Sequence, residues 1–156
     1  MLKELVVGAR APAFKLLTDQ GGEVSTSALK GKPFVLYFYP KDSTSGCTKE
    51  AIAFSENKKK FDALGVSIVG VSKDSVASHG KFRAKHNLTV TLASDPDIET
   101  AQAYSVWVEK SLYGRRYMGM DRATFLVDAK GVIRQIWRKV RVAGHIEAVL
   151  EAAKTL

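Results

Sequence analysis

Residues 34–50, FVLYFYPKDSTSGCTKE, contain the single cysteine of the 156-residue chain, Cys47. The apolar run at residues 34–39 predicts a central strand covered on both faces. Pro40 and a polar, glycine-containing turn follow, and apolar residues at positions 47, 51, 54 and 61 then repeat with helical spacing. We therefore expect Cys47 where a loop becomes a helix. The unpaired N–H groups at such a junction favour an anion, and a thiol placed there ionises more readily than a free cysteine does.

The rest of the chain alternates strands and helices around this segment. Residues 11–32 are rich in turn residues and predict a short hairpin or loop. After the cysteine, the pattern predicts a helix from residue 47 to Gly65, a strand at 66–71, and a helix that is capped by Asp74 or Ser75 and runs to about residue 86. A short helix should start at Asp95-Pro96-Asp97, and a β-hairpin should follow at 124–137. The chain should close with a helix whose apolar positions are Ile146, Val149, Leu150 and Ala153. Residues 106–120 fit no element clearly. This order predicts an α/β fold with a mixed central sheet flanked by helices on both faces, and a thioredoxin-like fold is its best match.

Composition predicts one domain over residues 1–156, because 46% apolar and 26% charged residues are typical of a globular chain with a real core. No segment approaches the ~18 consecutive apolar residues of a membrane span. The N-terminal residues 1–7 lack the pattern of a signal peptide. One cysteine cannot form an intramolecular disulfide, and a lone thiol suits a reducing compartment, so we expect a cytoplasmic protein.

The formal net charge of +8 is concentrated in the C-terminal third, where residues 105–156 carry ten Lys or Arg against five Asp or Glu. Residues 58–60 and 115–116 are the densest clusters. A nucleic-acid interface would need a recognition motif, or basic residues interleaved with aromatic ones on one face. No such motif occurs, so we interpret the charge as solvated surface that can attract anionic partners.

The chemistry centres on Thr44-x-x-Cys47, the frame in which thioredoxin-like oxidoreductases carry two cysteines. A hydroxyl replaces the first thiol, which excludes dithiol exchange within the pair but lets Thr44 donate a hydrogen bond to a nucleophilic thiolate. Residue types alone leave open a second interpretation, in which Cys47 is a small buried apolar side chain. The histidines His79, His86 and His145 are predicted to be exposed on helices, and they form no set of metal-ligand spacing with the cysteine.

The pattern Pro40-x-x-x-Thr44-x-x-Cys47 resembles the active-site motif of peroxiredoxins. The wider string from Tyr37 to Ala51 is similar to the bacterioferritin-comigratory-protein (PrxQ) subfamily. Further matching segments occur in order along nearly the whole chain, at residues 8–14, 31–32, 69–75, 94–95, 113–115 and 122–131. The resemblance implies a thioredoxin-like fold and a thiol-dependent peroxidase that reduces hydrogen peroxide and organic hydroperoxides without metal or other cofactor.

The resemblance also implies roles for particular residues. Cys47 would be the peroxidatic cysteine, attacking the O–O bond and becoming a sulfenic acid. Thr44 would hydrogen-bond the thiolate and the peroxide, Pro40 would shield the sulfur from water, and Arg122 would supply a fixed positive charge. Nothing in the spacing brings Arg122 near Cys47. Glu50 would orient that arginine, or would be an exposed helix carboxylate.

The chain departs from the subfamily at the positions where relatives carry a resolving cysteine, because Ile52 and Arg83 stand there. It therefore resembles a one-cysteine type, whether natural or produced by engineering, and is reduced by an external thiol: thioredoxin, glutaredoxin or glutathione. Ser45, where relatives often have proline, predicts a more pliable loop. The resemblance suggests a monomer. The alternative functions are a thioredoxin-fold binding or chaperone-like module and a monothiol transferase, in which Cys47 is not peroxidatic.

Overall fold

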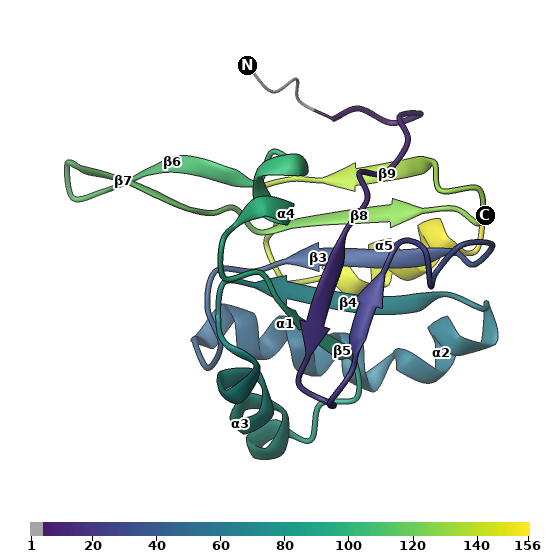
Figure 1. Cartoon of the computed structure of the whole chain (residues 1–156), viewed down its shortest axis with the longest axis horizontal. Coiled ribbons are helices and arrows are strands. Elements are labelled where there is room, and N and C mark those ends of the chain that lie inside the picture. Colours follow the sequence, from purple (N-terminus) through teal and green to yellow (C-terminus); the bar gives the residue numbers. More distant parts are fainter. Residues whose placement is uncertain (1–4) are drawn as a thin grey trace.

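The computed structural model describes residues 5–156, and its centre is a seven-stranded sheet in the order β2-β1-β5-β4-β3-β8-β9 (Figure 1). β3 pairs in parallel with β4 and antiparallel with β8, so the predicted mixed sheet is confirmed. The strands of this sheet are β1 (Lys15–Thr18), β2 (Glu23–Ser25), β3 (Phe34–Phe38), β4 (Ser67–Ser72), β5 (Thr91–Ser94), β8 (Ala123–Val127) and β9 (Ile133–Trp137). The prediction about a signal peptide rests in part on residues 1–4, which lie outside the described residues.

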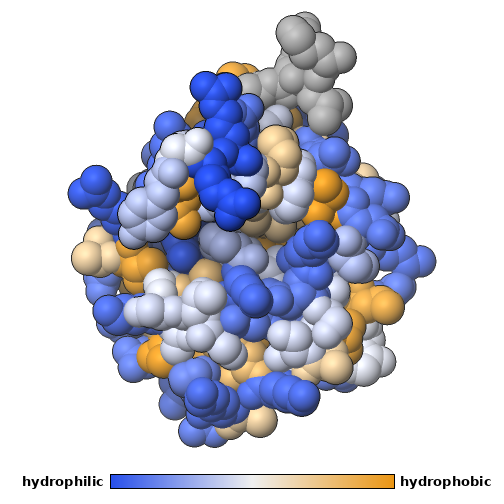
Figure 2. Space-filling view, turned by 90° about the vertical axis from the view of Figure 1, so that its left-hand side faces the viewer, coloured by the Kyte–Doolittle hydropathy of each residue, from blue (hydrophilic) through white to orange (hydrophobic). Residues whose placement is uncertain are grey.

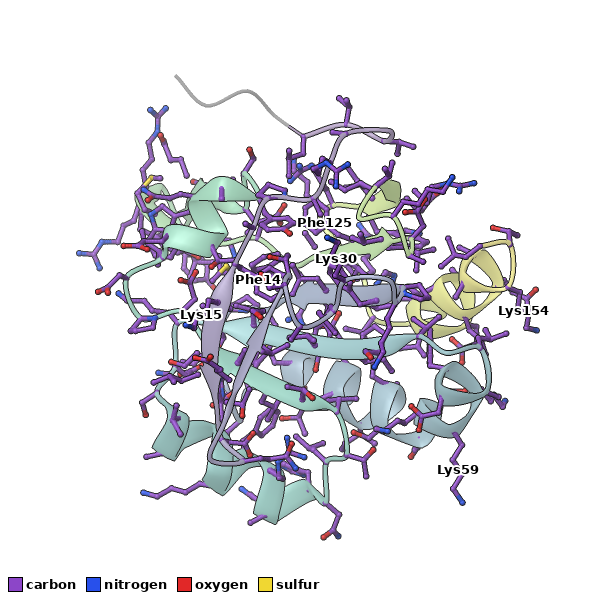
Figure 3. The ribbon with its side chains drawn as sticks, turned by 45° about the vertical axis from the view of Figure 1, so that its right-hand side comes forward. Phe14, Lys15, Lys30, Lys59, Phe125 and Lys154 are labelled. Atoms are coloured by element: carbon purple, nitrogen blue, oxygen red, sulfur yellow. The ribbon has the colours of Figure 1, made fainter. Side chains whose placement is uncertain are left out.

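Helices cover both faces of the sheet, as predicted. They are α1 (Ser45–Glu56), α2 (Lys58–Ala63), α3 (Val76–His86), α4 (Glu99–Ala103) and α5 (His145–Ala153). β3 is buried along its whole length, and its side chains alternate between two apolar clusters. The cluster with Tyr37 lies under α1, α2, α3 and α5, and the cluster with Phe38 lies under α4 and the N-terminal segment. Figure 3 shows Phe14 and Phe125 of the second cluster pointing into the interior, whereas Lys59 and Lys154 point outward.

Two predicted helix boundaries were wrong. The helix expected from residue 47 to Gly65 is interrupted at Asn57, whose side-chain amide donates to the Ala53 carbonyl at 2.8 Å in competition with the helical backbone. The helix expected to start at Asp95 starts instead at Glu99. The Asp95 carboxylate accepts the N–H groups of Thr100 and Ala101 from outside the helix, and Pro96 lies in the preceding turn.

Three strands were not predicted. β5 completes the parallel part of the sheet beside β4. The unassigned residues 106–120 form β6 (Trp107–Leu112) and β7 (Arg115–Met120), an antiparallel hairpin that is a separate two-stranded sheet. Figure 1 shows this hairpin projecting from the body of the molecule. It leaves the body at the edge where β3 ends and α1 begins.

Candidate active site

Cys47 lies in the first turn of α1, as the sequence predicted, and is a free thiol with 1% of its surface exposed. Thr44 occupies the cap position before the helix, with an extended backbone (φ −87°, ψ 155°). The sulfur therefore lies beside backbone N–H groups that have no partner within the helix, where partial positive charge favours an anion.

Arg122 lies directly against the sulfur. Its Nη2 donates to Cys47 Sγ at 3.2 Å, and its Nη1 donates to Glu50 Oε1 at 2.7 Å. The sheet explains this contact, because Ala123 at the start of β8 pairs with Phe38 at the end of β3. Arg122, which precedes β8, is thereby placed next to the loop that follows β3.

Gly46 leaves room for the guanidinium. A Cβ added at this residue would lie 3.0 Å from Arg122 Nη2 and 3.7 Å from its Cζ. Only a residue without a side chain allows the arginine to approach the start of α1 this closely without some displacement.

Glu50 is fully buried, so the alternative that it is an exposed helix carboxylate is wrong. Burial raises the pKa of Glu50 to about 7, and the opposing charge and hydrogen bond of Arg122 only partly offset this rise. Burial alone would lower the pKa of Arg122, but the negative charges of Glu50 and Cys47 outweigh it and raise that pKa. Among the described residues, Glu50 Oε2 has no hydrogen-bond partner. Arg122 thus bridges a carboxyl group that titrates near neutrality and the thiol.

Thr44 and Pro40 lie in the loop that leads into α1. The Thr44 hydroxyl donates to the Lys41 carbonyl at 2.7 Å, and no hydrogen bond joins it to Cys47 Sγ within residues 5–156. Since a hydroxyl has one proton, Thr44 in this arrangement offers acceptor lone pairs to a bound molecule. Pro40 is half-buried and follows directly after Tyr39, at the end of the central strand.

A buried polar network, which sequence reasoning missed, holds this loop in shape. The Asp42 carboxylate accepts hydrogen bonds from Tyr39 Oη at 2.6 Å and Ser78 Oγ at 2.8 Å, and lies 2.7 Å from His79 Nδ1. The Asp42 backbone N–H donates to Asp74 Oδ2 at 2.8 Å. We call these five residues the Asp42 network. It anchors the loop at Tyr39 and Asp42 and joins it to α3.

The loop needs this support because the residue after Asp42, Ser43, has φ 64°. Such left-handed backbone is uncommon for a residue other than glycine and persists only where surrounding contacts hold it. The network therefore fixes the turn that delivers Thr44 to its cap position.

Both ring nitrogens of His79 face acceptors. Nε2 lies 2.9 Å from the Ala93 carbonyl, which can only accept, and Nδ1 faces the Asp42 carboxylate. Burial would lower the pKa of His79, but the hydrogen bond and charge of Asp42 outweigh it and raise that pKa. Burial would likewise raise the pKa of Asp42, and the hydrogen bonds from His79 and Tyr39 lower it instead. The two shifts run in opposite directions, and each favours the ion pair between the two side chains.

The expectation of exposed helical histidines was wrong for two of the three. His79 is fully buried in the Asp42 network. His145 is buried at the start of α5, where Nε2 lies 2.8 Å from Thr124 Oγ1, and burial together with nearby Arg122 lowers its pKa to about 4. His86 is half-exposed and contacts the Phe82 ring edge to face.

The positions where relatives carry a resolving cysteine are occupied by structural side chains. Ile52 packs against the apolar cluster under α1. Arg83 pairs with Asp19, with Nη2 3.0 Å from Oδ1, and also donates to the carbonyls of Leu88 and Val90. With one cysteine in the whole chain, Cys47 has no intramolecular thiol partner.

Within the part of the chain that the structure describes, no three His, Cys, Asp or Glu side chains are grouped as metal ligands. Over the same residues, the helices are too short or too polar to cross a membrane.

A thiol at a helix start, held by an arginine beside a mixed sheet, places this chain among the thiol-based oxidoreductases. The AhpC/TSA family model matches residues 7–136, and the chain belongs to that family. It is 45% identical to peroxiredoxin Bcp of Bacillus subtilis, over 96% of each chain. Its fold superposes on peroxiredoxin Q of Xanthomonas campestris with a TM-score of 0.87 and 44% identity, covering 91% of this chain and 90% of the other. It also superposes on Xylella fastidiosa PrxQ, with a TM-score of 0.92 and 34% identity, covering 98% of each chain.

These relationships confirm the thioredoxin-like fold and the peroxiredoxin resemblance. The chain is an enzyme, a thiol-dependent peroxidase of one-cysteine type. A binding or chaperone-like module and a monothiol transferase, the alternatives that the sequence left open, are not favoured.

Proposed function

We propose that Cys47 is the peroxidatic cysteine and that it reduces hydrogen peroxide and organic hydroperoxides. The observation that carries this proposal is the 3.2 Å hydrogen bond from Arg122 to Sγ in the first turn of α1. A fixed cation and a helix N-terminus both favour the thiolate, which is the nucleophilic form of cysteine. The structurally similar bacterioferritin comigratory protein of Xanthomonas campestris has alkyl peroxide reduction activity, which supports organic hydroperoxides as substrates.

In the first half-reaction, the Cys47 thiolate attacks one peroxide oxygen. The S–O bond forms as the O–O bond breaks, the sulfur is oxidised by two electrons, and the departing oxygen takes a proton and leaves as water or an alcohol. Arg122 stabilises the negative charge as it moves from sulfur to the departing oxygen. The product on the enzyme is a sulfenic acid.

The neighbouring residues orient the peroxide. Thr44, whose proton is used on Lys41, accepts a hydrogen bond from the hydroperoxide OH. Pro40 presents no N–H and keeps water away from the sulfur. Glu50 holds Arg122 in place through the 2.7 Å hydrogen bond to Oε1.

In the second half-reaction, an external thiol attacks the sulfenic sulfur and releases water, and a second thiol then frees Cys47 from the mixed disulfide. Thioredoxin, glutaredoxin and glutathione are the candidate donors. We further propose that the protein is cytoplasmic, which its single free thiol supports, and that it is a monomer, as the subfamily resemblance implies.

The test is steady-state consumption of hydrogen peroxide and of an organic hydroperoxide, with each candidate thiol supplied in turn. Wild-type protein should consume both peroxides, and Cys47→Ser should consume neither. Retention of near wild-type turnover in Cys47→Ser would contradict the assignment. A protein that reduces mixed disulfides but leaves peroxides intact would instead be a monothiol transferase.

A further inference from the structure

The β6–β7 hairpin, residues 107–120, concentrates apolar surface that no other part of residues 5–156 covers. Nine large apolar side chains are exposed among the described residues, and four of them lie between residues 112 and 118. These four are Leu112, Tyr113, Tyr117 and Met118, with exposed fractions of 56%, 97%, 47% and 52%. A two-stranded ribbon has no second layer to bury such groups, and clustered apolar exposure marks a surface for interaction. We call residues 107–120 the hairpin arm.

The arm is also cationic. It carries Lys110, Arg115 and Arg116 against one carboxylate, Glu109, which lies 3.5 Å from Arg116. Figure 2 looks at the face from which the arm projects and shows strongly hydrophilic and hydrophobic side chains side by side. A surface of this composition complements a partner that is apolar and acidic.

The arm is joined to the active site. β7 ends at Met120, two residues before Arg122. Lys110 folds back along the ribbon, because a Cβ added at Gly119 would lie 3.3 Å from Lys110 Cδ and 3.4 Å from Tyr117 Cε2. Burial lowers the pKa of Lys110, and its charge interacts with Asp121, Arg122 and Cys47. One face of the arm therefore borders the site.

The chain needs a partner at this place. Cys47 is its only cysteine and is 1% exposed, so the thiol that reduces it must come from another molecule and be brought to a buried sulfur. A small thiol is too small to contact four exposed apolar side chains along the arm. A protein with a thiol on its surface is large enough to contact the arm and Cys47 together.

Resting on the peroxidase function proposed above, we propose that the hairpin arm is the docking surface for the reducing partner, a protein whose reactive cysteine lies in an acidic and apolar surface. Its thiolate attacks the sulfenic sulfur of Cys47, the S–S bond forms as the S–O bond breaks, and the hydroxide takes a proton and leaves as water. A second thiol of the partner then attacks its own sulfur in the mixed disulfide, which leaves the partner oxidised and Cys47 as a thiolate.

The test uses Cys47 converted to a mixed disulfide with thionitrobenzoate, so that reduction is followed by colour release without any peroxide step. The probes are an acidic thioredoxin and dithiothreitol. In the double variant Arg115→Glu/Arg116→Glu, the second-order rate constant with thioredoxin should fall at least about tenfold, since opposite charges accelerate association and like charges slow it. The rate constant with dithiothreitol should stay within about twofold of wild type.

The matched control is Lys59→Glu/Lys60→Glu, which changes the net charge equally on exposed residues of α2. It should leave the thioredoxin rate near wild type. Tyr113→Ser, which leaves the charge unchanged, should also slow reduction of the adduct by thioredoxin. In wild type, added salt should slow reduction by thioredoxin and should not slow reduction by dithiothreitol.

Equal thioredoxin rates in wild type and the Arg115/Arg116 variant would overturn the proposal, as would an equal loss in the α2 control. Wild-type protein that glutathione reduces faster than thioredoxin would overturn it too. Failure of the peroxidase function would appear separately, as a reduced Cys47 that hydrogen peroxide leaves unchanged.

Discussion

Two regions of opposite construction adjoin the active site: the Asp42 network holds the loop that precedes Thr44 and Cys47, and the hairpin arm ends two residues before Arg122. The Asp42 network is polar and largely buried, and its hydrogen bonds of 2.6–2.8 Å have the His79–Asp42 pair at their centre. The hairpin arm is exposed and partly apolar, and its strands form a sheet of two that is separate from the seven-stranded sheet. Buried, satisfied polar groups fix geometry, whereas an exposed ribbon fixes little but can be contacted. The comparison separates the two half-reactions: the network should govern attack on peroxide, and the arm should govern reduction.

The largest loss of reactivity toward peroxide is expected from Arg122→Met. Removing the cation that touches Sγ should slow the reaction with peroxide roughly 100- to 1,000-fold, as the loss of a preorganised donor does elsewhere. It should also move the acid limb of the pH–rate profile to higher pH. Stopped-flow oxidation of the reduced protein measures both. Arg116→Met in the arm is the matched control and should oxidise at the wild-type rate; equal slowing of the two variants would remove the distinction between regions.

Two substitutions of His79 separate its two hydrogen bonds. The Asn side-chain amide can replace Nδ1 toward Asp42, whereas the longer Gln amide replaces Nε2 toward the Ala93 carbonyl. Because the bond to Asp42 anchors the loop, His79→Gln should lower the peroxide rate roughly 10- to 100-fold, and His79→Asn should lower it less. Reduction of the thionitrobenzoate adduct by dithiothreitol should change little in either. The reverse order of the two variants would mean that the Ala93 bond, rather than the loop, is what matters.

The same pair predicts a pH dependence of stability. His79 has a raised pKa, so its contribution is full below its ordinary value of 6.5 and is lost as the pH rises through the raised value. Asp42 has a lowered pKa, so its contribution is present above its ordinary value of 3.8 and is lost as the pH falls through the lowered value. As the pH is raised from neutral to alkaline, the free energy of unfolding in urea should therefore fall less in His79→Asn than in wild type. A parallel loss in both proteins would contradict a stabilising contribution from the raised pKa of His79.

Gly46→Ala tests the close approach of the arginine. The added methyl group would lie 3.0 Å from Arg122 Nη2 and should displace the guanidinium by a few tenths of an ångström. We expect the peroxide rate to fall about 5- to 10-fold, because small displacements of a catalytic group are costly. Oxidation kinetics with tert-butyl hydroperoxide measure this loss. Gly80→Ala on α3, where an added Cβ meets nothing within 4 Å, is the control and should be neutral.

The smallest effect on rate is expected from Glu50→Gln, which keeps an oxygen for Arg122. Since burial raises the pKa of Glu50 from 4.5 to about 7, this group favours folding at low pH and loses that contribution as the pH rises through about 7. Between pH 5 and pH 8, the variant should therefore gain roughly 1–3 kcal/mol in stability relative to wild type. Urea unfolding at the two pH values measures the difference, and an unchanged difference between the proteins would show that Glu50 does not titrate in this range.

The elements that could be predicted are those whose apolar residues repeat with the period of a strand or a helix. The strand at 34–39 and the helix start at Cys47 followed from runs and spacings of apolar residues. Arg122 could be assigned only through family resemblance, since strand register brings it to Cys47 and register is not visible in one sequence. The Asp42 network was missed because burial of polar side chains leaves no periodic signal. The hairpin arm was missed because a ribbon without a covered face has no alternation to detect.

Mass spectrometry of peptides shows at the residue itself whether peroxide oxidises Cys47. Reduced protein is treated with one equivalent of hydrogen peroxide in the presence of dimedone and then digested. We expect a single dimedone adduct on Cys47 that forms within seconds and is absent from Cys47→Ser. Protein that keeps its original mass, with Cys47 unmodified, would contradict this expectation.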